Sequence, residues 1–179
     1  AGASAISILT EPYYFQGSNA YLQQIRAITE LPLLRKDFTV DAYMIYEAKI
    51  IGADAVLLIC SLLEKETLRQ YLQLCRQLGL EALVEAHDEK EIAMALATGA
   101  EIIGVNNRNL KDFTVDIGNS IRLRQMVPEQ VVFVAESGMK NRADIAQLEE
   151  AHVNGVLIGE TLMRSADKKR MLQQLKGLV

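Results

Sequence analysis

Charged and amide side chains recur in this sequence at the points where apolar, β-prone runs end. Lys36, Glu85, Asn106, Glu136 and Glu160 all occupy such positions. An ammonium group can stabilise a developing oxyanion, a carboxylate can move protons, and an amide can orient a substrate. Each residue alone is better explained as a solvated charge, a hydrogen-bond acceptor in a loop or a turn former. Side chains that leave successive parallel strands face one another and perturb one another's pKa values, so the joint pattern predicts a site.

Glycines follow the last two of these apolar runs, in Ser137-Gly138 and in Gly159-Glu160. Glycine allows backbone N–H groups to approach an anion, and loops after strands seven and eight of a (βα)8 barrel commonly hold phosphate. A short turn before a helix would explain either glycine alone. The pair favours phosphate binding by Gly138, Gly159 and the backbone N–H of Glu160.

The elements that would position these residues are marked by a repeated junction. Gly52, Gly79 and Gly99 each precede a short polar step and then an apolar run, as expected for a glycine that ends a helix in the left-handed conformation. Amphipathic stretches lie between the junctions, the clearest being 61–78, where Ser61 and Glu64 form a capping-box pattern. Other predicted N-caps are Ser18, Asp41, Asp88 and Asn141.

The apolar runs predict seven strands, near residues 5–10, 32–36, 54–59, 81–85, 101–106, 131–136 and 155–158. Strands that alternate with helices indicate a parallel α/β fold. No glycine-rich dinucleotide motif or Walker loop follows the first strand, so a barrel is favoured over a nucleotide-binding sheet. The chain opens on the helix-ending junction Gly2-Ala3-Ser4, and its 179 residues fall short of the roughly 250 of a full barrel. We therefore expect one incomplete domain over residues 1–179, a (βα)8 TIM barrel lacking strand 1 and helix 1.

Composition narrows the functional classes. A net charge of −4 and a pI near 5.3 argue against nucleic acid, and no apolar run approaches the roughly 20 residues of a membrane span. Cys60 and Cys75 form no CxxC motif, which favours buried thiols in the reducing cytoplasm. His87 and His152 are isolated, so we expect no metal site.

Five motifs resemble the indole-3-glycerol-phosphate synthase family, over a stretch from residue 1 to about residue 164. They are Ala5–Thr10 with Tyr14–Ser18, Pro32–Phe38, Gly104–Leu110, Val134–Met139 and Val156–Arg164. The resemblance implies a cofactor-free and metal-free lyase of tryptophan biosynthesis. Its substrate would be a phosphorylated aminodeoxyribulose, 1-(2-carboxyphenylamino)-1-deoxyribulose 5-phosphate, which undergoes ring closure, decarboxylation and dehydration to indole-3-glycerol phosphate.

The resemblance also implies roles for individual residues. Lys36 would be the general acid or electrostatic activator at the ribulose carbonyl, and Glu85 would act in the proton transfers of dehydration. Asn106, Glu136 and Ser137 would orient the substrate. Arg108 would bind its carboxylate, and the anthranilate ring would lie between two aromatic walls, Phe15 and Phe38.

The sequence departs from the family at one point, because no segment matches the strand-one glutamate and lysine. We therefore expect the chain alone to be nearly inactive, and its unpaired sheet edges to favour self-association or strand exchange. Two alternatives stay open. One is a non-catalytic, self-associating barrel fragment. The other is a sibling phosphosugar barrel such as phosphoribosylanthranilate isomerase, against which Lys36-Asp37-Phe38 and Asn106-Asn107-Arg108 argue.

Overall fold

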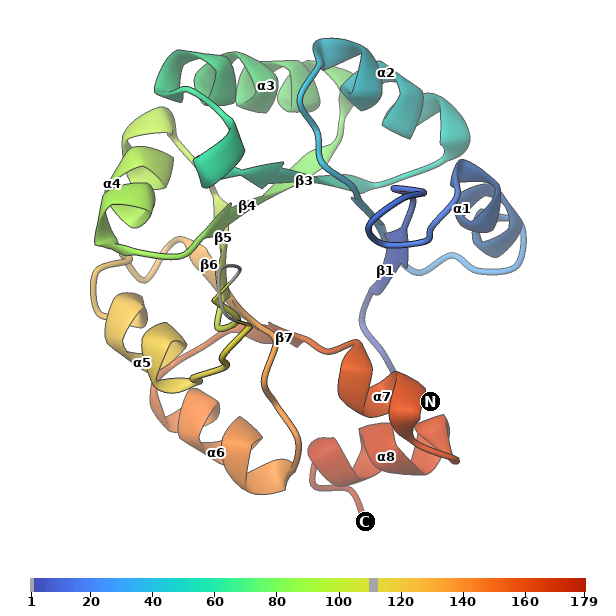
Figure 1. Ribbon diagram of the computed structural model, residues 1–179, viewed down its shortest axis with the longest axis vertical. Coiled ribbons are helices and arrows are strands. Elements are labelled where there is room, and N and C mark those ends of the chain that lie inside the picture. Colours follow the sequence, from blue (N-terminus) through green and yellow to red (C-terminus); the bar gives the residue numbers. More distant parts are fainter. Residues whose placement is uncertain (1, 110–112) are drawn as a thin grey trace. The chain divides into compact units, whose positions relative to one another are not determined.

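The computed structural model describes residues 2–109 and 113–179, in which parallel strands alternate with helices (Figure 1). The strands are β1 (Ile6–Leu9), β2 (Leu33–Lys36), β3 (Ala55–Ile59), β4 (Glu81–Ala86), β5 (Ile102–Asn106), β6 (Val132–Glu136) and β7 (Gly155–Leu157). The α-helices are α1 (Asn19–Arg26), α2 (Ala42–Ile51), α3 (Lys65–Leu78), α4 (Glu89–Thr98), α5 (Gly118–Arg124), α6 (Arg142–Glu150), α7 (Glu160–Arg164) and α8 (Lys168–Leu175). The predicted alternation is confirmed, and the seven strands have the parallel arrangement of the TIM-barrel class.

The chain divides into two compact units. The N-terminal unit consists of Ser4–Glu85 with Met94–Ala100, and its strands β1 to β4 pair in parallel in chain order. Leu9 lies in register with Lys36, and Ile59 with Glu85, so the carboxyl ends of these strands are aligned. Helices α2 and α3 pack side by side in this unit (Figure 1). Such parallel pairing requires a crossover after each strand, which the helices supply.

The C-terminal unit consists of Glu101–Val179 with Ala86–Ala93 and the first residues of the chain. Strands β5, β6 and β7 pair in parallel, and Asn106, Glu136 and Leu157 share one register position at their carboxyl ends. Helices α6 and α8 pack on each other through Ile145, Leu148 and Leu175, which are buried. The polar ends of β5 and β6 therefore lie next to each other.

Local sequence explains most element boundaries. The side chains of Ser18, Asp41 and Asn141 accept hydrogen bonds from the first turns of α1, α2 and α6, as predicted, and Asp88 accepts one from Glu91 N at the start of α4. The junction glycines Gly52, Gly79 and Gly99 all have positive φ, at 94°, 62° and 84°. Helix-ending glycines thus precede β3, β4 and β5, and polar N-caps set where α1, α2, α4 and α6 start.

The predicted capping box at Ser61 is wrong. Residues Cys60–Leu62 form a short 3-10 turn, Leu63 and Glu64 are extended, and α3 begins at Lys65 without a side-chain cap. The helical face was predicted correctly, because Leu68, Tyr71, Leu72 and Cys75 are buried. The helix therefore starts one turn later than its apolar and capping pattern suggested.

Apolar strand interiors form the cores of the two units. In β3, Val56, Leu57 and Leu58 have no exposed surface, and in the C-terminal unit Phe133 is equally buried. Both cysteines are buried, as predicted, and Cys60 and Cys75 form no disulfide with each other. No helix among the described residues is long and apolar enough to cross a membrane.

Candidate active site

Lys36 and Glu85 form an ion pair in the N-terminal unit, with 3.4 Å between Lys36 Nζ and Glu85 Oε2. Lys36 is the last residue of β2, and Glu85 lies near the end of β4, two strands away in the same sheet. The Glu85 side chain is 3% exposed and that of Lys36 is 16% exposed. The pair therefore places a partly exposed lysine amine next to a buried carboxylate at the carboxyl ends of the strands.

An aromatic pair lies in the same unit. The ring centroids of Phe15 and Phe38 are 4.8 Å apart and tilted by 36°, and Tyr14 meets Phe38 edge-on at 5.9 Å. Both phenylalanines are half-buried. Offset and edge-on ring pairs hold each other in place, so these residues offer a preformed apolar surface next to the end of β2.

Glu11 fixes the loop that carries Phe15. Its buried carboxylate accepts backbone hydrogen bonds from Tyr13, Tyr14 and Phe15 at 2.8, 2.5 and 2.9 Å. Burial raises the pKa of Glu11, but the three N–H groups outweigh that effect and lower it overall. The loop is then turned back over β1, where Gly17 lies so close to Leu9 O that a Cβ would stand 2.2 Å away. A charged carboxylate thus organises the aromatic surface.

A buried polar network lies beneath the end of β2. The Arg35 guanidinium donates to Asp37, Glu47 and Thr10 at 3.3, 2.6 and 3.2 Å, and to the carbonyl oxygen of Met44 at 2.8 Å. Asp37 also accepts from Phe38 N at 2.8 Å. A buried network whose polar groups are hydrogen-bonded makes its surroundings rigid. The backbone at Arg35 and Asp37, on either side of Lys36, is therefore fixed in position.

The candidate residues of the C-terminal unit follow β5, β6 and β7. Asn106 Oδ1 accepts from Arg108 N at 3.0 Å and closes the turn after β5. The Arg108 guanidinium donates to Glu160 Oε2 at 2.9 Å, and Arg164 Nε donates to the other oxygen of Glu160 at 3.0 Å. Hydrogen bonds from Arg164 and then Arg108 lower the pKa of Glu160. Arg108 is thus already paired with a carboxylate.

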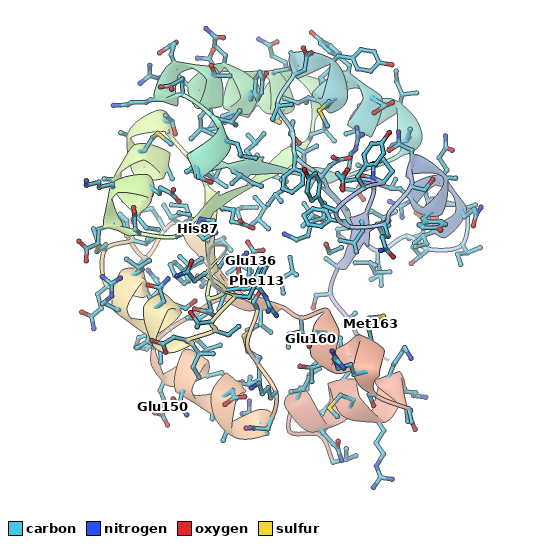
Figure 2. All side chains as sticks on the ribbon, in the orientation of Figure 1. His87, Phe113, Glu136, Glu150, Glu160 and Met163 are labelled. Carbon is cyan, nitrogen blue, oxygen red and sulfur yellow. The ribbon has the colours of Figure 1, made fainter. Side chains whose placement is uncertain are left out.

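The end of β6 carries Glu136, Ser137 and Gly138 in succession. Glu136 is buried, and Figure 2 shows it at the end of β6, with Glu160 at the start of α7. Ser137 has φ +64° and Gly138 has φ +96°, so the chain turns sharply there. Residues other than glycine rarely adopt this left-handed backbone conformation. A Cβ on Gly138 would stand 2.6 Å from Val115 Cγ1. Only glycine fits there.

Gly159 differs from Gly138. It is the residue before α7, its φ is −110°, and a Cβ there would have no atom within 4 Å. The backbone conformation therefore does not require glycine at this position. The open space is consistent with a group approaching the backbone closely.

The structure groups the predicted residues as follows. The N-terminal unit contains one ion pair and one ring pair, formed by Lys36 with Glu85 and Phe15 with Phe38. The C-terminal unit contains the chain of contacts that joins Asn106, Arg108 and Glu160, and the consecutive residues Glu136, Ser137 and Gly138. Gly159 adjoins Glu160 at the start of α7.

Sequence reasoning missed Glu11, Arg35 and Asn107 as residues that organise the site. Asn107 is buried, and its amide contacts Ser120 and Ser137, which are 13 and 30 positions later. Glu11 carried a usable signal, because a carboxylate at a strand end followed by Pro12 favours a tight turn. Arg35 and Asn107 carried no comparable signal, since their partners are distant in sequence.

Parallel strands with polar residues at their carboxyl ends define an α/β enzyme of the TIM-barrel class. The 3-hexulose-6-phosphate synthase of Salmonella typhimurium matches with a TM-score of 0.80 and 13% identity, over 96% of this chain and 85% of that one. Thiamine phosphate pyrophosphorylase from Pyrococcus furiosus matches with a TM-score of 0.74 and 17% identity, over 99% and 83%. At these identities the likeness concerns the fold alone.

Sequence comparison gives the family. The indole-3-glycerol phosphate synthase family model matches residues 1–175. The indole-3-glycerol phosphate synthase of Ruminiclostridium cellulolyticum is 55% identical over 177 residues, and that of Leuconostoc mesenteroides subsp. mesenteroides is 54% identical over 177. Each alignment covers 99% of this chain and 68% of the relative. The chain belongs to the indole-3-glycerol phosphate synthase family, carboxy-lyases of tryptophan biosynthesis, and the predicted resemblance is confirmed.

Proposed function

We propose that the chain carries the residues for converting 1-(2-carboxyphenylamino)-1-deoxyribulose 5-phosphate to indole-3-glycerol phosphate. The observation that carries this proposal is the Lys36–Glu85 pair, an ammonium group held at 3.4 Å over a carboxylate that is 3% exposed. As the aromatic carbon attacks the carbonyl carbon of the ribulose, Lys36 donates a proton to the carbonyl oxygen or stabilises the negative charge that develops on it. Carbon dioxide then leaves, and Glu85 moves the protons that accompany loss of water.

The remaining residues hold the substrate. Phe15 and Phe38 pack against the anthranilate ring, while Arg108 binds its carboxylate. Asn106, Glu136 and Ser137 orient the ribulose hydroxyls. Backbone N–H groups around Gly138, Gly159 and Glu160 take the phosphate, a role favoured by the turn at Gly138 and the open space at Gly159. The 179 residues form one incomplete barrel domain in this proposal.

We propose further that these 179 residues alone turn over slowly. The family resemblance implies a catalytic lysine and glutamate on the first strand of the barrel, and no segment of the 179 residues matches that strand. The chain spans 68% of the length of the relatives it matches. Loss of a charge-stabilising group costs on the order of 10²–10³ in rate. The absence of tryptophan from the chain permits a direct assay, because no indole emission of the protein then overlaps that of the product.

The experiment compares the purified chain with Lys36→Met and Glu85→Gln variants. We expect slow product formation by the chain and a further loss in both variants, with acceleration when a peptide covering the family's strand-one segment is added. Product formation at the rate of a full-length relative would overturn the proposal of low activity. Turnover that is unchanged in both variants would overturn the roles of Lys36 and Glu85.

A second proposal, self-association, follows from the edge strands. In the N-terminal unit β1 pairs with β2, and Leu9 is 41% exposed; in the C-terminal unit β7 pairs with β6, and Val156 is 38% exposed. An apolar hollow lined by Leu148, Val156 and Leu175 adjoins β7. Exposed strand edges favour strand addition between copies, so sedimentation should show concentration-dependent mass that Val156→Lys reduces. A compact monomer at all concentrations would contradict it.

The two proposals are separable. A non-catalytic fragment would self-associate but stay inactive when the strand-one peptide is supplied, whereas a damaged enzyme would regain turnover.

The family assignment argues against phosphoribosylanthranilate isomerase as the activity. A cytoplasmic location is part of the proposal, since Cys60 and Cys75 are buried thiols that form no disulfide with each other.

A further inference from the structure

Asn107 connects three elements of the C-terminal unit through its side chain. Its Oδ1 accepts from Ser120 N at 3.0 Å and from Ser120 Oγ at 2.8 Å, both in α5. Its Nδ2 donates to the carbonyl oxygen of Ser137 at 3.1 Å, just beyond β6. The end of β5, the first turns of α5 and the turn after β6 are therefore joined by one amide.

The backbone of Asn107 adds to this connection. Asn107 N donates to Glu136 O at 2.9 Å, and Asn107 O accepts from Asp116 N at 3.1 Å. Asn107 is 4% exposed and Ser120 has no exposed surface. Hydrogen bonds in such a dry setting are strong, and breaking one leaves a buried group unsatisfied.

The turn that Asn107 contacts is unusual. Ser137 has φ +64°, a conformation that is strained for a residue with a side chain, and Gly138 follows at φ +96°. A hydrogen bond to the Ser137 carbonyl fixes the peptide plane between Ser137 and Gly138. That plane determines where the Gly138 N–H points.

We propose that Asn107 is a positioning residue, which orients the Ser137–Gly138 turn relative to Asn106 and Arg108 for ligand binding. The inference rests on the proposed function, which places substrate contacts at these four residues. An amide is the side chain that meets both demands, because it accepts two hydrogen bonds at Oδ1 while donating one from Nδ2.

Asn107→Asp tests the donor specifically. The introduced carboxylate still accepts from Ser120, but when charged it cannot donate to Ser137 O and repels it. Asn154→Ala is the control: the Asn154 amide accepts from Phe133 N at 2.8 Å, in the same sheet but at the amino-terminal side of β6 and β7. The probes are indole-3-glycerol phosphate, followed by its own fluorescence, and the amide NMR signals of Ser137 and Gly138.

We expect N107D to bind indole-3-glycerol phosphate about tenfold more weakly than the unaltered chain near pH 8. Protonation of the introduced carboxyl at lower pH supplies a donor again, so the ratio of the two affinities should return toward one. The Gly138 signal should move in N107D, and N154A should leave both the affinity and that signal unchanged.

Two different failures can be told apart. An unaltered chain that binds no indole-3-glycerol phosphate contradicts the proposed function. Ser137 and Gly138 signals that stay in place in N107D overturn the inference about Asn107, whether or not the chain binds product. Wild-type affinity in N107D at every pH overturns it as well.

Discussion

Gly138 and Gly159 provide a matched pair for testing whether backbone geometry, rather than glycine content, defines the turn after β6. Gly138 has φ +96°, and an added Cβ would stand 2.6 Å from Val115 Cγ1 and 3.1 Å from Ile117 Cγ2. Gly159 has φ −110° and no atom within 4 Å of the same added carbon. Alanine should therefore be poorly tolerated at the first position and tolerated at the second.

The magnitude for Gly138→Ala has two parts. A side chain at such a φ costs about 1–2 kcal/mol, and a contact at 2.6 Å that forces its neighbours to shift costs about 1–3 kcal/mol. The free energy of unfolding should thus fall by about 2–5 kcal/mol, a large share of the typical total of about 5–15 kcal/mol. Gly159→Ala should change it by less than about 0.5 kcal/mol.

Urea unfolding followed by circular dichroism measures both variants against the unaltered chain. Equal stability of the two variants, or a loss below about 1 kcal/mol for G138A, would refute the reasoning, because the left-handed turn would then be freely adjustable. Inorganic phosphate titration of G159A adds a functional test. Weaker phosphate binding without loss of stability is expected if the Gly159 backbone contacts the anion.

Three further predictions concern buried groups. The pKa of Glu11 is lowered in the folded chain, so the charged carboxylate stabilises the fold at pH values above its unfolded pKa. That stability is lost as the pH falls through the folded pKa. The Glu11→Gln variant should therefore have a lower melting temperature than the unaltered chain at pH 7 but not near pH 3. Burial, then the charge of Glu81, raises the pKa of Cys75 to about 12, so Cys75 should resist a thiol reagent at pH 8 until the chain is unfolded. Arg35→Met should cost about 3–5 kcal/mol in urea unfolding, because Asp37 loses its buried partner; retained stability would mean that the network contributes little.

The strands were predictable because a strand that is buried on both faces has an almost entirely apolar sequence. In β3, four of the five residues are buried, and Ala55–Ile59 reads as an unbroken apolar run. Helix ends were predictable where a glycine takes positive φ, as at Gly52 and Gly79. The start of α3 was not, because extended residues at Leu63 and Glu64 separate Ser61 from the helix. A capping pattern cannot reveal such an interruption.

The candidate site was predictable only as a set of strand ends. Lys36 and Glu85 were expected at the ends of parallel strands, and the structure pairs them across 49 positions of sequence. The Asn107 contacts and the Arg108–Glu160 pair depend on side chains that folding brings together from 13 to 52 positions away. Spacing along the chain carries no information about such pairs, so these contacts emerged only from the structure.

The Glu160 carboxylate that bridges Arg108 and Arg164 has a consequence for how any anion would be recognised there. A carboxylate that binds to Arg108 would exchange with the resident one, so its affinity would reflect the difference between two similar ion pairs. Added salt screens both pairs alike. Occupancy of Arg108 should accordingly depend less steeply on ionic strength than it would for a solitary guanidinium, and selectivity would then come from the shape of the rest of the ligand.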